Sequence, residues 1–348
     1  MEEKYVKMEE ASKLVLNKIE SYLYDNPSVD EKEFLKTLEK DILATNNVDL
    51  FFRLLLGDWS RHIYKKAYEK AIIESKDPKY NYLFAQRFYW DEEVENAVLE
   101  SKNPENSYLF AKDISGSNKK AHAKVVLESK NPEYNYLFAR DISVARKRAH
   151  ARVVLESKNP KYNYLYMIDV PGANEKAHSK VILESKDPEY NCKAALYMYG
   201  KEKRSIFTHK ETDKHVQVVL DSKDLIANFK LTTSLSFITV PKSIQIIIDS
   251  KDLEYNYQMA LKKRKFLSEH EQVILDAKNI NYIYKFVKHV EGADIEAHRQ
   301  VILEAQKRNH LEEDERKIMD KFLKEFPCSA NSNEIANMKS LIKKYKFD

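Results

Sequence analysis

Residues 131–158 read NPEYNYLFARDISVARKRAHARVVLESK, and this stretch returns along the chain in recognisable form. Its closing box is E-S-K followed by Asn or Asp and then Pro. The position of the box serine is filled, copy by copy, by Ser75, Ser101, Ser129, Ser157, Ser185, Ser222, Ser250, Ala277 and Ala305. Most steps between copies are 28 residues and one is 37. A fixed period of this length predicts a repeat array.

One copy contains the signals of two helices. Asn131 is a good N-cap, because its side chain can accept from free N–H groups of the first turn, and Pro132 suits the first helical position. We expect helix A to run over 134–142, with apolar residues on one face, and helix B over 146–158. Neither helix is long enough to be stable alone, so stacking must bury both.

The turn between the helices is clearest in three other copies. There, glycine is expected as the C-cap of helix A and Asn or Asp as the N-cap of helix B. These pairs are Gly116 with Asn118, Gly172 with Asn174, and Gly292 with Asp294.

The period predicts an all-α fold, a right-handed-type α-solenoid of about eight helix–turn–helix repeats with helical caps at both ends. We expect three divisions of the chain: an N-terminal cap over 1–68, a repeat array over 69–307 with degenerate repeats at 187–277, and a C-terminal cap over 308–348. The helices expected at the N-terminal end are 2–24, 31–44, 48–56 and 59–75. Those expected in the C-terminal cap are 311–326 and 332–346. The β-prone stretch 231–240 is assigned by its register to helix A and the turn of a degenerate copy.

The composition of the chain limits its expected cellular location. The chain has 348 residues, 43% of them hydrophobic, and a formal charge of +4. Two cysteines, Cys192 and Cys328, form no disulfide framework and favour a reducing interior. The charged N-terminus predicts no signal peptide, and no apolar run approaches a membrane span. We therefore expect a cytoplasmic location and no membrane partner.

Six histidines precede the box position by seven residues: His122, His150, His178, His215, His270 and His298. Equivalent residues of neighbouring repeats should lie on the order of 9–10 Å apart. That is too far to share a zinc ion, whose bonds to nitrogen are about 2 Å long. A structural ladder is the better interpretation, and no metal is expected. Asp113, Asp141 and Asp169 are predicted to bond these histidines or to cap helix B.

Two further rows follow the same period. Asn81, Asn135, Asn163, Asn191, Asn228 and Asn256 should be buried amides that bond backbone of the adjacent copy. Tyr82, Tyr108, Tyr136, Tyr164, Tyr257 and Tyr284 should pack between repeats with a wet hydroxyl, or else form part of a binding surface. A basic residue follows several of these tyrosines at i+4, as Arg140 follows Tyr136.

The candidate partner-binding residues are basic. A basic ridge occupies matched positions of helix B in three consecutive copies: Lys120, Lys124, Arg148, Arg152, Lys176 and Lys180. A second basic edge is predicted near the A–B turns: Lys201, Lys203 and Arg204, then Lys262, Lys263 and Arg264. The first of these clusters opens the insertion at 200–213, and insertions in solenoids often lie on the binding face. A solvated charged face is the alternative for the ridge.

No phosphate-binding loop, zinc-protease motif or nucleophile elbow occurs in the sequence, so no enzyme activity and no cofactor are expected. The phrase at 131–158 resembles tandem short two-helix repeats of TPR- and HEAT-like α-solenoid proteins from low-GC bacteria and their phages. The resemblance covers residues 69–307 and implies a superhelix. It carries no activity and no functional residues.

Three function classes remain open from the sequence. The first is a protein-binding scaffold, in a phage or mobile element one that inhibits a host factor. The second is a nucleic-acid-binding repeat protein that uses the basic ridge, although a charge of +4 is modest for that role. The third, a HEAT-like nucleic-acid enzyme, would require a catalytic carboxylate in a basic cleft.

Overall fold

The computed structural model describes residues 2–28, 30–57, 65–143, 145–202, 210–235, 240–262, 267–307 and 312–327. Within these ranges every regular element is an α-helix, and adjacent helix pairs pack on one another repeatedly. The expected all-α, solenoid-type fold is confirmed at this level. The chain divides into two compact units, Met1–Ser185 and Lys186–Asp348, and each is described by itself. In the same ranges, no helix is long and apolar enough to cross a membrane.

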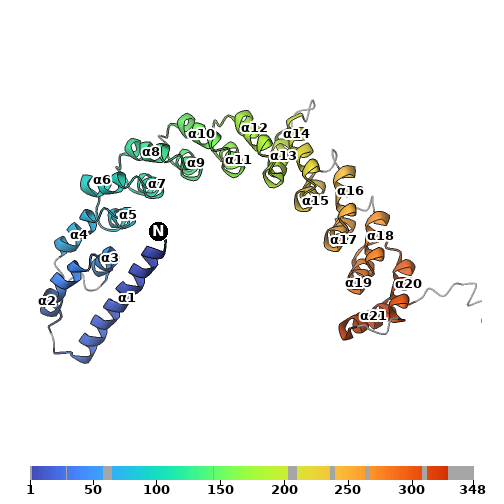
Figure 1. The fold of residues 1–348 in the computed structure, drawn as a ribbon, viewed down its shortest axis with the longest axis horizontal. Helices are drawn as coiled ribbons and strands as arrows, with labels where there is room; N and C mark the ends of the chain where they lie inside the picture. Colours follow the sequence, from blue (N-terminus) through green and yellow to red (C-terminus); the bar gives the residue numbers. More distant parts are fainter. Residues whose placement is uncertain are drawn as a thin grey trace, which may run out of the picture. The chain divides into compact units, whose positions relative to one another are not determined.

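Unit 1 alternates helices of two layers (Figure 1). From α5 onward, odd-numbered helices are the A helices and even-numbered ones the B helices. The bounds are α1 Glu2–Asp25, α2 Glu31–Ala44, α3 Val48–Leu56, α4 Lys65–Glu74, α5 Pro78–Arg87, α6 Glu92–Glu100, α7 Pro104–Asp113, α8 Lys119–Glu128, α9 Pro132–Asp141, α10 Lys147–Glu156, α11 Pro160–Asp169 and α12 Glu175–Ser185.

Unit 2, taken by itself, also alternates helices of two layers. Its helices are α13 Pro188–Glu202, α14 Lys210–Ser222, α15 Leu225–Ser234, α16 Val240–Ser250, α17 Leu253–Lys262, α18 Leu267–Ala277, α19 Ile280–His289, α20 Ile295–Gln306 and α21 Glu313–Glu325. The helix expected at 311–326 is α21, whereas the one expected at 332–346 lies outside the described residues. Of the stretch 231–240, residues 231–234 end helix α15, as the register predicts, Leu235 is its C-cap, and Val240 already begins α16.

The box that defines the repeat joins one helix pair to the next. Ser129 Oγ donates to the Val126 carbonyl at 2.7 Å and accepts from the Asn131 N–H at 3.2 Å. Asn131 then caps α9, accepting from the Glu133 N–H at 2.9 Å. Between them Lys130 has a φ of +52°, in the left-handed region. The same conformation recurs at Lys76, Lys102, Lys158, Lys186, Lys223, Lys251 and Lys278.

A left-handed backbone costs a side chain-bearing residue roughly 1–2 kcal/mol relative to glycine. Lys158→Gly is therefore expected to leave the fold intact and to raise the free energy of unfolding by up to about 1 kcal/mol. Lys158→Val should lower it, because β-branching worsens the same conformation. Urea denaturation of both variants measures the difference; a Gly variant less stable than the Val variant would contradict the assignment.

The A–B turn differs from the expectation in one respect. Helix α7 ends at Asp113 with Ile114 as its C-cap, in extended backbone and buried. Gly116, expected as that cap, lies two residues further on with a φ of +85°. The buried Ile114 side chain ends the helix first, and the glycine then makes the turn toward α8. The N-caps Asn118, Asn174 and Asp294 are confirmed, each accepting from the N–H three residues on.

The insertion at 200–213 is in part an extension of its neighbours. Helix α13 continues to Glu202 and α14 already begins at Lys210. The described portion is thus helical rather than a loop, and residues 203–209 lie outside the described part.

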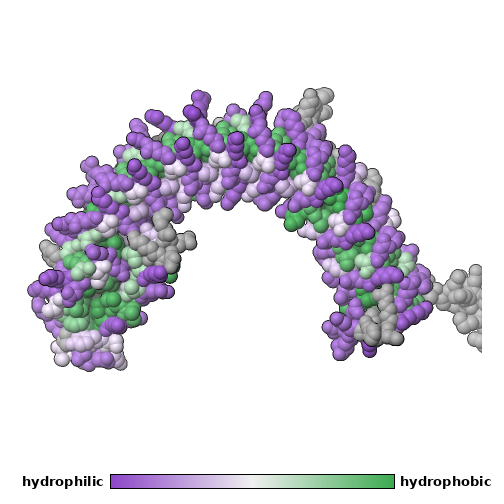
Figure 2. Space-filling view, in the orientation of Figure 1, coloured by the Kyte–Doolittle hydropathy of each residue, from purple (hydrophilic) through white to green (hydrophobic). Residues whose placement is uncertain are grey.

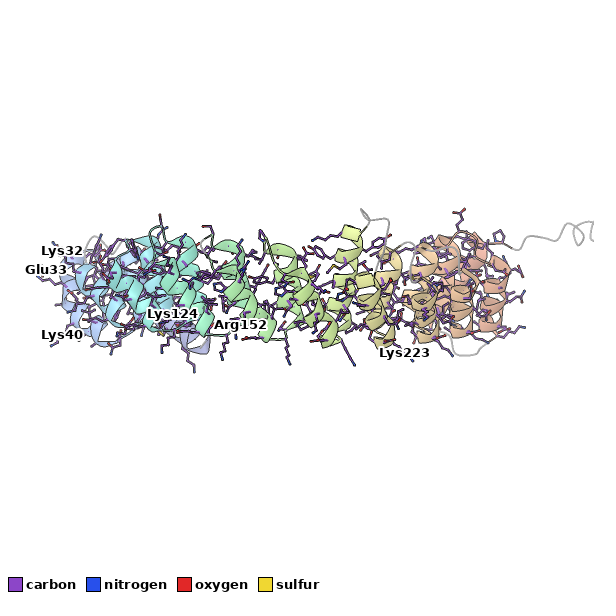
Figure 3. All side chains as sticks on the ribbon, turned by 90° about the horizontal axis from the view of Figure 1, so that it is seen from above. Lys32, Glu33, Lys40, Lys124, Arg152 and Lys223 are labelled. Carbon is purple, nitrogen blue, oxygen red and sulfur yellow. The ribbon has the colours of Figure 1, made fainter. Side chains whose placement is uncertain are left out.

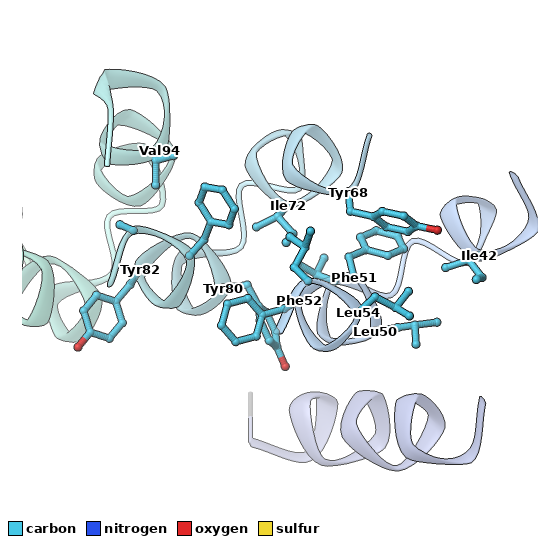
Figure 4. Close-up of a cluster of buried hydrophobic side chains, with 14 of the residues drawn as sticks. Ile42, Leu50, Phe51, Phe52, Leu54, Tyr68, Ile72, Tyr80, Tyr82 and Val94 are labelled. Carbon is cyan, nitrogen blue, oxygen red and sulfur yellow. The ribbon is translucent and has the colours of Figure 1, made fainter. Parts of the chain in front are cut away.

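The first helices share an aromatic core with the start of the array (Figure 4). The ring of Phe51 in α3 packs against that of Tyr68 in α4, with centroids 5.9 Å apart. Phe52 packs against Tyr80 of α5 at 6.0 Å. All four side chains are buried, so α3 and α4 form one continuous core with the first repeats.

Candidate partner-binding surfaces

The histidine row is a buried structural ladder. His150 Nδ1 lies 2.8 Å from Asn135 Oδ1, and because an amide oxygen only accepts, Nδ1 carries the hydrogen. Asn135 Nδ2 in turn donates to the Val126 carbonyl of the preceding copy and to the Asn131 carbonyl, both at 2.8 Å. Asn135 thus links polar groups of three consecutive helices, α8, α9 and α10. The same His–Asn bond is made by Asn163 with His178, Asn191 with His215, and Asn256 with His270.

Burial keeps five of the histidines neutral. It lowers the pKa of His122, His150, His178, His215 and His270 to about 4 in each case. Three of the imidazoles also stack on an aromatic ring of helix A, as His150 does on Phe138 with ring centroids 5.1 Å apart. Among the described residues no group of three His, Cys, Asp or Glu side chains could hold a metal ion.

Two copies lack the asparagine and use a different partner. Ser107 stands at the position of Asn135, and His122 there bonds Glu95 Oε1 through Nε2 at 3.0 Å. Glu95 comes from the preceding B helix and also accepts from the Asn118 N–H at 2.6 Å. Glu271 makes the same two contacts, to His298 at 3.0 Å and to the Asp294 N–H at 2.6 Å. Sequence reasoning missed both glutamates, although both stand six residues before the box position.

The predicted pairing of Asp113, Asp141 and Asp169 with histidines or helix B caps is wrong. Each carboxylate instead accepts from a tyrosine hydroxyl of the preceding A helix: Asp113 from Tyr82 at 2.6 Å, Asp141 from Tyr108, and Asp169 from Tyr136. The reason is position: the aspartates end helix A on its solvent side, whereas the histidines lie fully buried.

Four tyrosines of this row, Tyr82, Tyr108, Tyr136 and Tyr257, are buried, as expected for packing residues, whereas Tyr164 and Tyr284 are half-buried. Tyr108 and Tyr136 are 5% and 3% exposed. The i+4 cation contributes, since Arg140 Nη1 donates to the Tyr136 hydroxyl oxygen at 3.0 Å. These pairs therefore connect consecutive A helices rather than offering free hydroxyls.

The basic ridge lies on α8, α10 and α12, with every member exposed. Lys124 and Arg152 project from neighbouring helices (Figure 3), and hydrophilic side chains line this outer edge of unit 1 (Figure 2). The second cation of each pair meets the box glutamate at i+4: Lys124–Glu128 at 3.8 Å, Arg152–Glu156 at 2.7 Å and Lys180–Glu184 at 3.7 Å. The first cation lies in the opening turn of its helix, and the opening turns of α8 and α10 hold no acidic residue.

Reversing charge should separate these two rows. Lys120→Glu, Arg148→Glu and Lys176→Glu are expected to leave stability unchanged or slightly raise it, because a carboxylate suits a helix N-terminus by about 0.3–1 kcal/mol. Lys124→Glu, Arg152→Glu and Lys180→Glu should cost about 0.5 kcal/mol each, since each replaces an i,i+4 ion pair with a repulsive one. Thermal melts of the two triple variants measure the difference; equal melting temperatures would contradict it.

The other basic candidates lie in unit 2. Lys201 and Lys262 are exposed, with their ammonium nitrogens 4.8 Å from the Tyr197 ring centroid and 5.1 Å from that of Phe229. Lys203, Arg204, Lys263 and Arg264 lie outside the described residues. The structure therefore relates only the ridge residues to one another.

A second repeated surface feature of unit 1 is a row of leucines on the A helices, and each of these leucines also packs against a buried core cluster. Six residues after each N-cap stands a half-buried leucine; Leu109, Leu137 and Leu165 of α7, α9 and α11 form what we call the leucine lane. Exposed charged residues flank it, two residues after the N-cap at Glu105, Glu133 and Lys161. The leucine of the repeated Y-N-Y-L-F-A phrase was the signal for this lane, but the sequence alone did not separate it from the core.

Comparison of the chain with protein-family models, with curated proteins and with solved structures gives no match in any of the three.

Proposed function

We propose that the chain is a non-enzymatic scaffold that binds another protein through the exposed faces of its repeats. The observation that carries the proposal is the division of polar groups in the repeats. The histidines and asparagines bond one another and backbone, and Tyr136 bonds an aspartate of the next helix A, whereas exposed charged side chains and half-buried leucines repeat in register on the outside of the helices. Solenoids use such extended repeating surfaces for recognition.

The finer architecture belongs to the same proposal. About eight right-handed two-helix repeats over 69–307 would provide the binding surface. Residues 1–68 and 308–348 would close its two ends by covering the terminal apolar faces.

Quantitative affinity capture tests the function. The tagged full chain and two variants, Lys120→Glu/Arg148→Glu/Lys176→Glu on the ridge and Leu137→Asp on the A face, are used as baits in lysate of the source cells. We expect one protein that rebinds as a purified pair and is lost from at least one variant that keeps its helical spectrum. A chain that captures no rebinding protein would contradict the proposal.

The ridge also supports a second candidate, nucleic-acid binding. Lys120, Arg148 and Lys176 are the cations that no box glutamate faces at i+4, and backbone phosphates are neutralised by such side chains. Gel shifts with DNA and RNA at two salt concentrations test this candidate. Binding that weakens with salt and disappears on reversal of the three charges would favour it; no shift at low salt would exclude it.

A further inference from the structure

The first helix of the chain, α1, is an example of a helix packed on the A helices. Helix α1 packs on α3 and reaches α5 within unit 1 (Figure 1). The Tyr5 hydroxyl donates to Asp77 at 3.2 Å, and its ring meets the Tyr80 ring edge-on at 6.1 Å. Lys79 Nζ lies 4.6 Å from the Tyr5 centroid. An amphipathic helix thus lies on the side of the A layer that bears Asp77 and Lys79.

One carboxylate fixes the electrostatics of this contact. Glu9 of α1 lies 4.0 Å from the Arg53 guanidinium and 3.5 Å from the Lys79 ammonium. Arg53 is itself held by Asp49, whose carboxylate oxygen accepts from its Nε at 2.6 Å. Below this polar contact, Ser12 and Ile19 of α1 are buried.

The positions that α1 uses recur in later A helices. Asn47 and Asp77 are the N-caps of α3 and α5, so Arg53 stands six residues after its cap and Lys79 two residues after its own. Counted from Asn103 and Asn131, the N-caps of α7 and α9, the same two positions are Leu109 and Glu133. At these two positions Glu133 is exposed and Leu109 half-buried, and the packing of α1 is on α3 and on Asp77 and Tyr80 of α5.

We propose that the leucine lane of α7, α9 and α11 receives an amphipathic α-helix of the partner protein, in the manner of α1 on α3 and α5. The partner helix would lay apolar side chains on Leu109, Leu137 and Leu165 and direct lysine or arginine toward Glu105 and Glu133. Helices bound in grooves use such i, i+3, i+4 anchors, and opposite charges fix the register. This inference rests on the proposed function and names the chemistry of the partner.

The internal helix supplies a defined probe. Shifted from α3 and α5 onto α7 and α9, α1 would place Glu9 between Leu109 and Glu133, where a lysine fits and a glutamate is repelled. A labelled synthetic peptide of residues 2–25 carrying Glu9→Lys is therefore titrated with the full chain and followed by fluorescence anisotropy. We expect saturable binding, at least about tenfold tighter than that of the unmodified peptide.

Variants of the full chain locate the site. Glu133→Lys should weaken binding of the Glu9→Lys peptide about tenfold and strengthen binding of the unmodified one, a charge swap that a loss of folding cannot mimic. Leu137→Asp should also weaken it, and Arg152→Glu on the opposite layer should not. Absence of binding, or binding indifferent to Glu133→Lys, would overturn the inference. The inference would also be overturned if the protein forms a homodimer that becomes monomeric in the Leu137→Asp variant, because the leucine lane would then bind a second copy of the chain.

The outcome of the peptide-binding experiment is distinguishable from the outcome of the affinity-capture test of the proposed function. If a rebinding protein is captured and lost only from the ridge variant, the scaffold function stands and the leucine lane is not its site. If no protein rebinds, the scaffold function fails even where the peptide binds.

Discussion

Asn135→Ser is expected to lower the free energy of unfolding by about 3 kcal/mol, since an unpaired buried polar group costs roughly 1–3 kcal/mol. The substitution removes both donor bonds of the Asn135 amide, to the Val126 and Asn131 carbonyls. It also removes the acceptor of His150 Nδ1. Urea denaturation followed by circular dichroism measures the loss. A change under about 1 kcal/mol would show that the ladder is incidental to stability.

The chain itself supplies the compensating change. Where Ser107 replaces the asparagine, Glu95 bonds His122 instead, and Ala123 stands at the position of Glu95 relative to His150. The double variant Asn135→Ser/Ala123→Glu should therefore be more stable than the sum of its single variants by about 1–2 kcal/mol. Strictly additive effects would contradict the equivalence of the two pairings. His178 with Asn163 and Ala151 provides a second, independent test.

Acidification should unfold the protein through the same ladder. Burial lowers the pKa of five histidines from 6.5 to about 4. Because the unfolded chain then binds more protons than the folded one, stability is complete above pH 6.5 and falls as the pH decreases toward 4. Each such histidine contributes a slope of about 1.4 kcal/mol per pH unit in this window.

One substitution checks the origin of this slope. His150→Gln removes one titrating ladder residue, so its slope between pH 6 and 5 should be smaller than that of the unmodified chain by about 1.4 kcal/mol per pH unit. Denaturation series of both proteins at several pH values provide the two slopes. Equal slopes would remove the ladder from the account of acid sensitivity.

Much of the fold follows from the sequence, because each copy contains its own start and stop signals. Asn131 and Pro132 begin α9 as predicted, and Asn118 begins α8. The buried role of Asn135 was also predictable, whereas the sequence left two alternatives for Tyr136, packing between repeats or a binding surface, and the structure shows the first. The box lysine was predictable only as the end of helix B. Its left-handed backbone follows from joining two capped helices through a single residue.

The hydrogen-bond partners that side chains find in neighbouring repeats could not be predicted. By sequence spacing alone, Asp141 could pair with a histidine or with a tyrosine. Because Asp141 lies on the solvent side of helix A, its carboxylate accepts from the Tyr108 hydroxyl. Glu95 bonds a residue 27 positions away, across two helices, so no local pattern indicates it. The leucine lane was hidden for a related reason. Leu137 is apolar like its core neighbours, and only packing shows it half-buried beside the exposed Glu133.

Hydrogen–deuterium exchange of the full chain, alone and with its purified captured partner, tests the central claim that binding uses the exposed faces of the repeats. We predict protection in peptides from helices α7, α9 and α11, between Pro104 and Asp169. The Lys120→Glu/Arg148→Glu/Lys176→Glu variant is expected to show the same protection. Protection confined to residues 1–68 or 308–348, with the repeats exchanging as in the free chain, would contradict the account.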